Sequence, residues 1–178
     1  MKRLVLTGHR VINDACLETM EIILTDWYMA HTTGLTVISG GNLGTKWKPS
    51  GADRMWAKAA ANLHIPYEIW VPKGYGEHYY SHSGDMMKRF NNMCKGASKV
   101  VYAPPTEPFH WQNNFVRNEM MVGTGTDFFS CSSIEPRLLL KKSNGGTADA
   151  VKEMAKNGIS SVHWIRSTDG ADMGEMPL

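Results

Sequence analysis

The sequence predicts an α/β protein with a doubly wound, mainly parallel sheet and helices on both faces. Short apolar segments with strand character alternate along the chain with longer segments of helical spacing, as in repeated βαβ units. Several of the apolar segments are hydrophobic at consecutive positions, which is typical of strands buried on both faces. The 178 residues are enough for one such domain with a sizeable core.

The first half of the chain predicts three strands separated by two helices. Strands are expected at Arg3–Leu6, Leu35–Ser39 and Tyr67–Val71, where apolar residues run together between glycine or proline turns. The segment Asp14–Ala30 places its apolar residues three and four positions apart, which is the spacing of an amphipathic helix. The segment Ala52–Leu63 is rich in strong helix formers.

The second half continues the alternation. Helices are expected at Asp85–Cys94, Asn114–Val122 and Thr147–Asn157, and strands at Lys99–Tyr102, Asp127–Cys131 and Ser161–Ile165. The segment 73–85, KGYGEHYYSHSGD, is expected to be a loop because glycines and polar residues dominate it. We expect one domain over residues 1–166, followed by a flexible, glycine-rich tail at 167–178.

Composition limits the possible partners. The formal net charge of +2, from 19 basic and 17 acidic residues, is too balanced to favour nucleic acid. Three widely spaced cysteines suggest reduced thiols, and His78 and His82 lack a third metal ligand. The apolar run in MKRLVLTGHR is too short for a signal peptide, and no window has the length of a membrane span. We expect a cytoplasmic protein without membrane contact, metal or other cofactor.

A first candidate loop, Thr7-Gly8-His9-Arg10, directly follows the first predicted strand. A hydroxyl, a glycine and a cation at such a position suit an anionic ligand, because glycine lets a ligand approach the backbone closely. A plain turn at the strand exit explains the same residues equally well.

A second candidate loop begins at Ser39, Gly40 and Gly41, where the second strand ends. We expect the amides of these glycines, together with the N-terminus of the helix from residue 52, to surround an anion. Asp53 is predicted to cap that helix, to bind a ribose hydroxyl or to brace the loop. Arg54 is expected either to pair with phosphate or to be solvated.

Two further loops have similar chemistry. Arg117 and Asn118 lie in a short helix after the fourth strand, and Gly145, Gly146 and Thr147 open the last long helix. Arginine suits bidentate phosphate contacts, and a helix N-terminus favours an anion. Because parallel strands end at one edge of the sheet, all four loops should converge there, which predicts a phosphate-bearing, nucleotide-like ligand.

Two longer loops have open roles. In the 42–50 loop, Lys46, Trp47 and Lys48 are expected to form an exposed loop, although a flap over the ligand is an alternative. In the 104–113 loop, aromatic residues such as Trp111 are expected either to stack on a base or to fill a loop core.

The segments TGHR, SGG with GADRMWAKAA, RNEMM and GGTADAVKEMAKNGI, in this order, resemble the SLOG superfamily of Rossmann-like proteins, especially small bacterial and phage members. The resemblance extends from the first strand to about Ile165. It implies a Rossmann-like fold and, in many members, a homo-oligomer. The superfamily includes the lonely-guy phosphoribohydrolases, DNA-processing proteins and predicted sensors of nucleotide-derived signals.

The phosphoribohydrolase pattern matches this chain only in part. Arg117 matches the arginine of its Arg-Lys-x-x-Met helix, but Asn118 stands in place of the lysine. The position of the catalytic glutamate falls on Ala150. Asp149 is one residue early, which on a helix turns a side chain by roughly 100°, and Glu119 is another acid nearby.

We therefore expect a protein that binds a nucleotide-derived molecule, such as an ADP-ribose or NAD-like compound or a nucleoside phosphate, as a sensor or sequestering protein. The alternative is an enzyme, either a nucleotide N-glycosidase or a deoxyribosyltransferase-like protein. In that case the resemblance implies catalytic roles for Asp149, Glu119 and Arg117.

Overall fold

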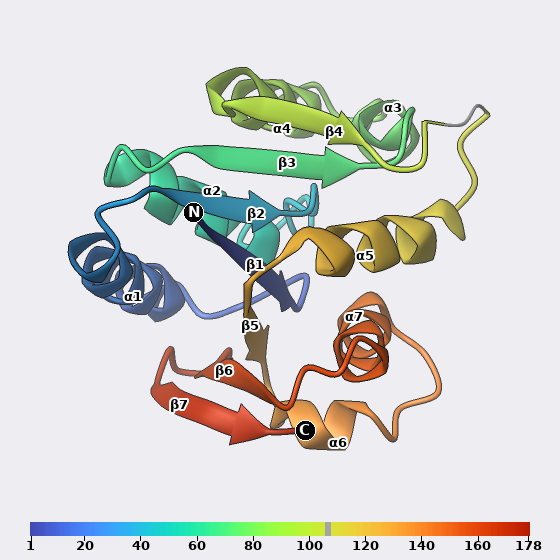
Figure 1. Ribbon diagram of the computed structural model, residues 1–178. Helices are drawn as coiled ribbons and strands as arrows, with labels where there is room; N and C mark the ends of the chain where they lie inside the picture. Colours follow the sequence, from blue (N-terminus) through green and yellow to red (C-terminus); the bar gives the residue numbers. More distant parts are fainter. Residues whose placement is uncertain (106–107) are drawn as a thin grey trace.

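A computed structural model describes residues 1–105 and 108–178 and has a seven-stranded sheet in the order β4-β3-β2-β1-β5-β6-β7 (Figure 1). The strands are β1 Lys2–Gly8, β2 Leu35–Ser39, β3 Tyr67–Val71, β4 Lys99–Tyr102, β5 Asp127–Ser132, β6 Ser161–Arg166 and β7 Asp172–Pro177. The first six run parallel, and β7 pairs antiparallel with β6 at one edge. The predicted α/β, Rossmann-like, doubly wound fold is confirmed.

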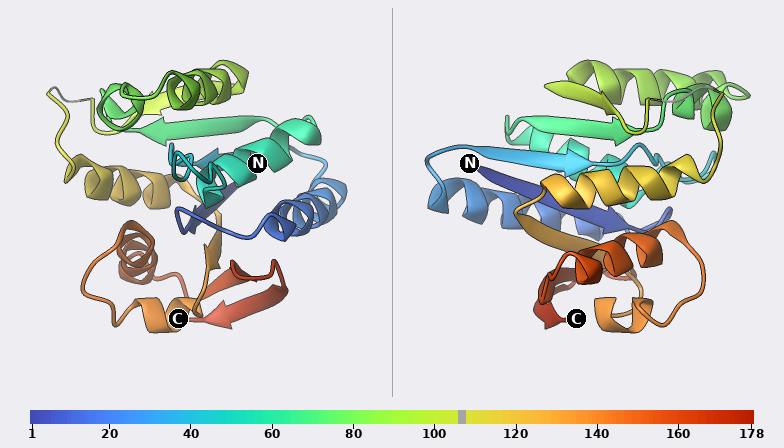
Figure 2. Two further views of the ribbon diagram at one scale, coloured as in Figure 1. Left: turned by 180° about the vertical axis from the view of Figure 1, so that it is seen from behind. Right: turned by 45° about the vertical axis from the view of Figure 1, so that its right-hand side comes forward.

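Helices cover both faces of the sheet (Figures 1 and 2). They are α1 Ala15–Ala30, α2 Ala52–Asn62, α3 Tyr75–Tyr80, α4 Gly84–Gly96, α5 Asn113–Thr124, α6 Pro136–Leu139 and α7 Gly146–Lys156. Residues of α1 to α4 pack into one hydrophobic core, and residues of α5 to α7 pack into a second core. The two cores lie on opposite faces of the sheet.

The alternation within β1 shows why its apolar residues are consecutive. Leu4 and Leu6 belong to the core under α1 and α2, whereas Val5 belongs to the core under α5 and α7. Successive side chains of a strand point to opposite faces, so a strand buried on both sides needs apolar residues at every position. All three side chains are fully buried.

The order of the strands places a switch point beside β1. The chain adds β2, β3 and β4 outward on one side of β1, and then α5 returns it to β5 on the other side (Figure 1). Right-handed crossovers put α5 on the face opposite to α1 and α2. The loops after β1 and β5 therefore diverge at the carboxyl ends of the strands, where sheets of this kind bind ligands.

The bounds of β2, β3 and β4 are those predicted, but two segments differ from expectation. The segment 73–85 is not a loop throughout, because it contains α3, whose Tyr75 and Tyr80 are buried against Phe90 of α4. The expected flexible tail contains β7, which pairs with β6 through positions such as Val162 and Met176. Packing against distant residues stabilises both elements, which the glycines and polar residues of these segments conceal in the sequence.

Candidate functional site

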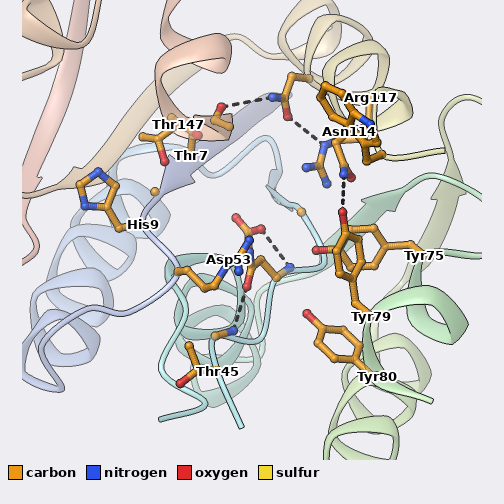
Figure 3. A pocket seen from close by; sticks show the side chains of 18 of the residues that line it. Thr7, His9, Thr45, Asp53, Tyr75, Tyr79, Tyr80, Asn114, Arg117 and Thr147 are labelled. Atoms are coloured by element: carbon orange, nitrogen blue, oxygen red, sulfur yellow. Dashed lines mark hydrogen bonds between the residues drawn. The ribbon is translucent and has the colours of Figure 1, made fainter. Parts of the chain in front are cut away.

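A cavity of about 520 Å³ lies at the carboxyl ends of β1 and β2, between the loops after these strands and the helices α3, α5 and α7 (Figure 3). Ten of the residues predicted from the sequence line it: Thr7, Gly8, His9, Arg10, Gly40, Asp53, Arg117, Asn118, Gly146 and Thr147. The loops therefore converge on one rim, as their positions after parallel strands predict. Gly145 adjoins this wall as the residue that precedes α7.

Other predicted residues do not line the cavity. The Ser39 hydroxyl donates to the backbone oxygen of Asp53 at 2.6 Å, and Arg54 Nη1 donates to the oxygen of Pro49 at 2.8 Å. Gly41 faces the protein interior, because a Cβ added there would lie 2.3 Å from Val71 Cγ1. Their roles are structural in this conformation.

Arg117 is the centre of a buried hydrogen-bond network that joins α5 to α7. Its Nε donates to Asn118 Oδ1 at 2.9 Å, and its Nη1 donates to the backbone oxygen of Trp70 at 2.9 Å. The Asn118 amide then donates to Gly146 O at 3.2 Å and to Asp149 Oδ2 at 3.0 Å. The guanidinium is thereby held in one orientation at the cavity wall.

The acids expected for catalysis lie behind or outside this wall. Asp149 accepts the hydrogen bond from Asn118, and burial raises the pKa of its carboxyl group despite that bond. Glu119 is exposed on α5 and does not line the cavity. Among the described lining residues, Asp53 is the only one with a carboxyl group.

Asp53 braces the loop that follows β2. Helix α2 begins after Gly51 without a side-chain cap, so Asp53 is not the cap, and its Oδ2 accepts from the amide of Asn42 at 3.1 Å. Burial raises the pKa of Asp53, and the nearby Arg117 charge opposes this rise. A Cβ on Gly40 would lie 2.5 Å from Asp53 Oδ2 and 2.8 Å from Arg117 Nη1, so glycine is needed there.

These contacts correct the expected role of the second loop. The amides of Gly40 and Asn42 face the carboxylate of Asp53, so the protein's own anion takes the place expected for a ligand's anion. The first amide of α2, that of Ala52, donates to the backbone oxygen of His9 at 3.0 Å. At this loop the cavity therefore meets the Asp53 carboxylate, a hydrogen-bond acceptor, and not a set of free amides that could bind an anion.

A different part of the cavity suits an anion. The Thr7 side chain is buried, and its hydroxyl has no hydrogen-bond partner among the described residues. Thr147 lies beside it (Figure 3), in the first turn of α7, which has no side-chain cap. Side chains added at Gly145 or Gly146 would meet no atom within 4 Å, so the approach to this helix N-terminus is open.

His9 borders the same end of the cavity (Figure 3). Its Nδ1 accepts from the amide of Ser133 at 3.4 Å. Burial, with a smaller effect from the charge of Lys142, lowers the pKa of His9, so the imidazole is neutral at neutral pH. A neutral ring with Nδ1 as acceptor keeps its proton on Nε2, which can donate a hydrogen bond.

Aromatic side chains form the opposite wall. Tyr75 and Tyr79 of α3 lie with ring centroids 4.7 Å apart, and the Tyr79 hydroxyl accepts from Asn114 Nδ2 at 3.0 Å. Trp111 and Phe115 pack edge to face at 5.5 Å and also line the cavity. The α3 tyrosines were missed from the sequence, although their spacing in YGEHYY is helical and was a usable signal.

Comparisons with known proteins add no identification, because no family model matches the chain and no curated protein matches it either. The resemblance to the SLOG superfamily therefore stays a prediction. Within residues 1–105 and 108–178, no helix combines the length and apolar character needed to cross a membrane. The same residues contain no group of three or more side chains suited to hold a metal ion.

Proposed function

We propose that the protein binds a nucleotide-derived small molecule in this cavity. The observation that carries the proposal is the order in which three kinds of side chain lie across one cavity: hydroxyl groups, then a carboxylate, then aromatic rings. In Figure 3, Thr7 and Thr147 lie at one side, Asp53 lies in the middle, and Tyr75 and Tyr79 form the opposite wall. A phosphate, a sugar and a base occur in that order in a nucleotide.

The phosphate would bind between Thr7 and the N-terminus of α7. Unpaired amides and the helix dipole favour negative charge there, and the Thr7 hydroxyl at the cavity can donate one further hydrogen bond. Nucleotides are the common biological ligands that combine such an anion with a flat heterocycle.

The sugar and the base would occupy the remainder of the cavity. The Asp53 carboxylate suits sugar hydroxyls as a charged acceptor, while one of its oxygens keeps its bond to Asn42. A base would stack against Tyr79, Trp111 or Phe115, a contact worth about 1–3 kcal/mol per base.

Binding without turnover is the function that these residues support best, as in a sensor or a sequestering protein. A nucleotide N-glycosidase or deoxyribosyltransferase-like enzyme needs a carboxyl group at the anomeric carbon. Asp149 is engaged by Asn118, and Glu119 is exposed. Asp53 does line the cavity, but its carboxylate is held by the amides of Gly40 and Asn42. We keep the enzyme as an alternative that base release from a nucleoside monophosphate would establish.

The test begins with native mass spectrometry of the purified protein, followed by calorimetric titration with AMP, ADP-ribose and NAD. We expect at least one of these adenine nucleotides to bind in the micromolar range or tighter. Thr7→Val should weaken that binding, whereas Thr36→Val, the same change on β2 away from the cavity, should not. If no nucleotide binds and none co-purifies, the proposal is wrong.

A further inference from the structure

Three basic side chains line the cavity, and none of them has a partner of opposite charge among the residues that the structure describes. Arg10 follows β1, Lys46 lies in the loop before α2, and His82 lies between α3 and α4. Within the described part of the chain, no carboxylate oxygen lies within 4 Å of any of these side chains, since the ion pairs there involve other residues. Three segments far apart in sequence thus bring donors without a carboxylate partner to one cavity. The Lys46 ammonium lies 5.5 Å from the ring centroid of Trp47, an exposed contact that leaves it free to bind an anion.

The backbone that carries Lys46 is held in a tight turn. The Thr45 amide donates to Lys48 O at 3.0 Å, and the Lys48 amide donates back to Thr45 Oγ1 at 3.0 Å. Gly44 enters the turn with a φ of 106°, and its amide donates to Asn42 Oδ1 at 2.9 Å. The position of Lys46 at the cavity is therefore built into the loop, so binding an anion there would order little additional backbone.

Arg10 lines the cavity together with tyrosines of α3. Burial raises the pKa of the Tyr80 hydroxyl, and the charge of Arg10 is close enough to oppose that rise. In Figure 3, Thr45 and Tyr80 lie on the far side of Asp53 from Thr7 and Thr147. The sequence predicted that Arg10 and Thr7 hold the phosphate or ribose of one ligand, and this geometry favours separate positions for the two residues on it.

We propose that Arg10, Lys46 and His82 form a second anion subsite, which takes a second phosphate group on the other side of the sugar. The inference rests on the proposed function and narrows it. The ligand is then a nucleotide with phosphate groups on two sides of the sugar, rather than a nucleoside monophosphate. The cationic side chains of Arg10 and Lys46 attract such an anion to a concave site, and their bonds to phosphate are charge-assisted, while the His82 imidazole supplies a further hydrogen-bond donor.

The experiment compares AMP, ADP and adenosine 3′,5′-bisphosphate by calorimetric titration of the wild-type protein. The bisphosphate should bind at least about tenfold more tightly than AMP, the effect of one hydrogen bond between charged groups. The affinity of ADP should exceed that of AMP by clearly less than tenfold, because both phosphates of ADP lie on the same side of the sugar. In the double variant Arg10→Ala/Lys46→Ala, the ratio of the AMP and bisphosphate dissociation constants should fall close to one.

Lys48→Ala is the matched control. It removes the same charge from the same turn, but Lys48 does not line the cavity, so the ratio should stay at its wild-type value. Arg10, Lys46 and Lys48 are all exposed, so the variants should fold, which circular dichroism would check.

The outcomes separate the two proposals. If AMP binds and the bisphosphate binds no more tightly, the second subsite is wrong and the proposed function stands. The same conclusion follows if ADP gains as much as the bisphosphate, or if Lys48→Ala abolishes the gain as the double variant does. If none of the three nucleotides binds but ADP-ribose or NAD does, the subsite is wrong and the proposed function stands. If no nucleotide binds and none co-purifies, both proposals fail.

Discussion

At the amino-terminal edge of the sheet, charged side chains are paired with one another, whereas at the carboxyl rim they face an open cavity. Near the amino edge, Arg3 donates to both carboxylate oxygens of Glu68, at 2.9 and 3.2 Å, and Trp70 Nε1 donates to the same group at 2.8 Å. Burial favours a higher pKa for Glu68, but these bonds outweigh it, so the pKa is lowered.

At the carboxyl rim, the effect of burial on the carboxyl groups outweighs that of their hydrogen bonds. Burial raises the pKa of both Asp53 and Asp149, and the Thr7 hydroxyl has no partner in the described residues. An ionised carboxyl group whose pKa is raised reduces the stability of the fold at neutral pH. The groups at the amino edge therefore favour the folded state, whereas the rim keeps unfavourable groups, which the proposed ligand would compensate.

The largest effect on stability is expected at the amino edge. Glu68→Ala leaves Arg3 and the Trp70 indole without their acceptor, so the free energy of unfolding should fall by about 2 kcal/mol. Nucleotide affinity should not change, because Glu68 is remote from the cavity. Urea denaturation and calorimetric titration measure the two quantities.

An exposed ion pair provides the control for that variant. Glu135 pairs with Arg137, whose side chain is 61% exposed, at 3.3 Å. Glu135→Ala should lower the free energy of unfolding by no more than about 0.5 kcal/mol. Equal losses in the two variants would contradict the special role of the amino edge.

The two regions should also differ in their response to pH. The pKa of Glu68 is lowered in the folded protein. Its contribution to the free energy of unfolding is therefore fully present above the ordinary pKa of 4.5, and it is lost as the pH falls through the lowered pKa of the folded state. Asp53 has a raised pKa, so its contribution to stability increases as pH falls toward its ordinary value of 3.8.

Substitutions at Glu68 and Asp53 separate these two opposite effects of pH on stability. Between about pH 5 and pH 3, the free energy of unfolding of Glu68→Gln should fall less steeply than that of the wild type. Asp53→Asn should fall more steeply, because it lacks the opposing contribution of Asp53. Denaturant titrations at several pH values measure the slopes, and parallel curves for all three proteins would refute the assignment.

Asp53→Asn at neutral pH tests the acceptor at the centre of the cavity. The amide oxygen can still accept from Asn42 and the cost of burying the Asp53 charge disappears, but the Gly40 amide loses an acceptor and the buried Arg117 loses a nearby negative charge. These effects oppose each other, so the free energy of unfolding should change by less than about 1 kcal/mol. Nucleotide affinity should fall about tenfold with the loss of a charged acceptor. Asp26→Asn, a change at an exposed position of α1, should alter neither quantity.

The smallest effect on stability is expected for Thr7→Val at the rim. Thr7 lines the cavity and its hydroxyl has no partner among the described residues, so removing it should change the free energy of unfolding by less than about 0.5 kcal/mol. Nucleotide affinity should fall severalfold. A large loss of stability would mean that the hydroxyl has a structural partner in solution.

The sequence predicted the positions of β2, β3 and β4 to the residue, because runs of buried apolar residues between turns are a local signal. It also located most of the loops at the cavity. It failed at α3 and β7, where the local residues are polar or glycine-rich and stability comes from packing on α4 and pairing with β6. It also assigned Asp53 as a possible cap, a choice that only the contact with Asn42 resolves.

By itself, the sequence determined that strands alternate with helices and that glycine-rich turns follow the strands, because these features depend on residues a few positions apart. Only the tertiary structure decided which side chains face the cavity. Gly40 faces it while Gly41 packs inward, and Asn118 engages Gly146, 28 residues away, together with Asp149. The direction of a side chain depends on the packing of elements distant in sequence, which no local pattern contains.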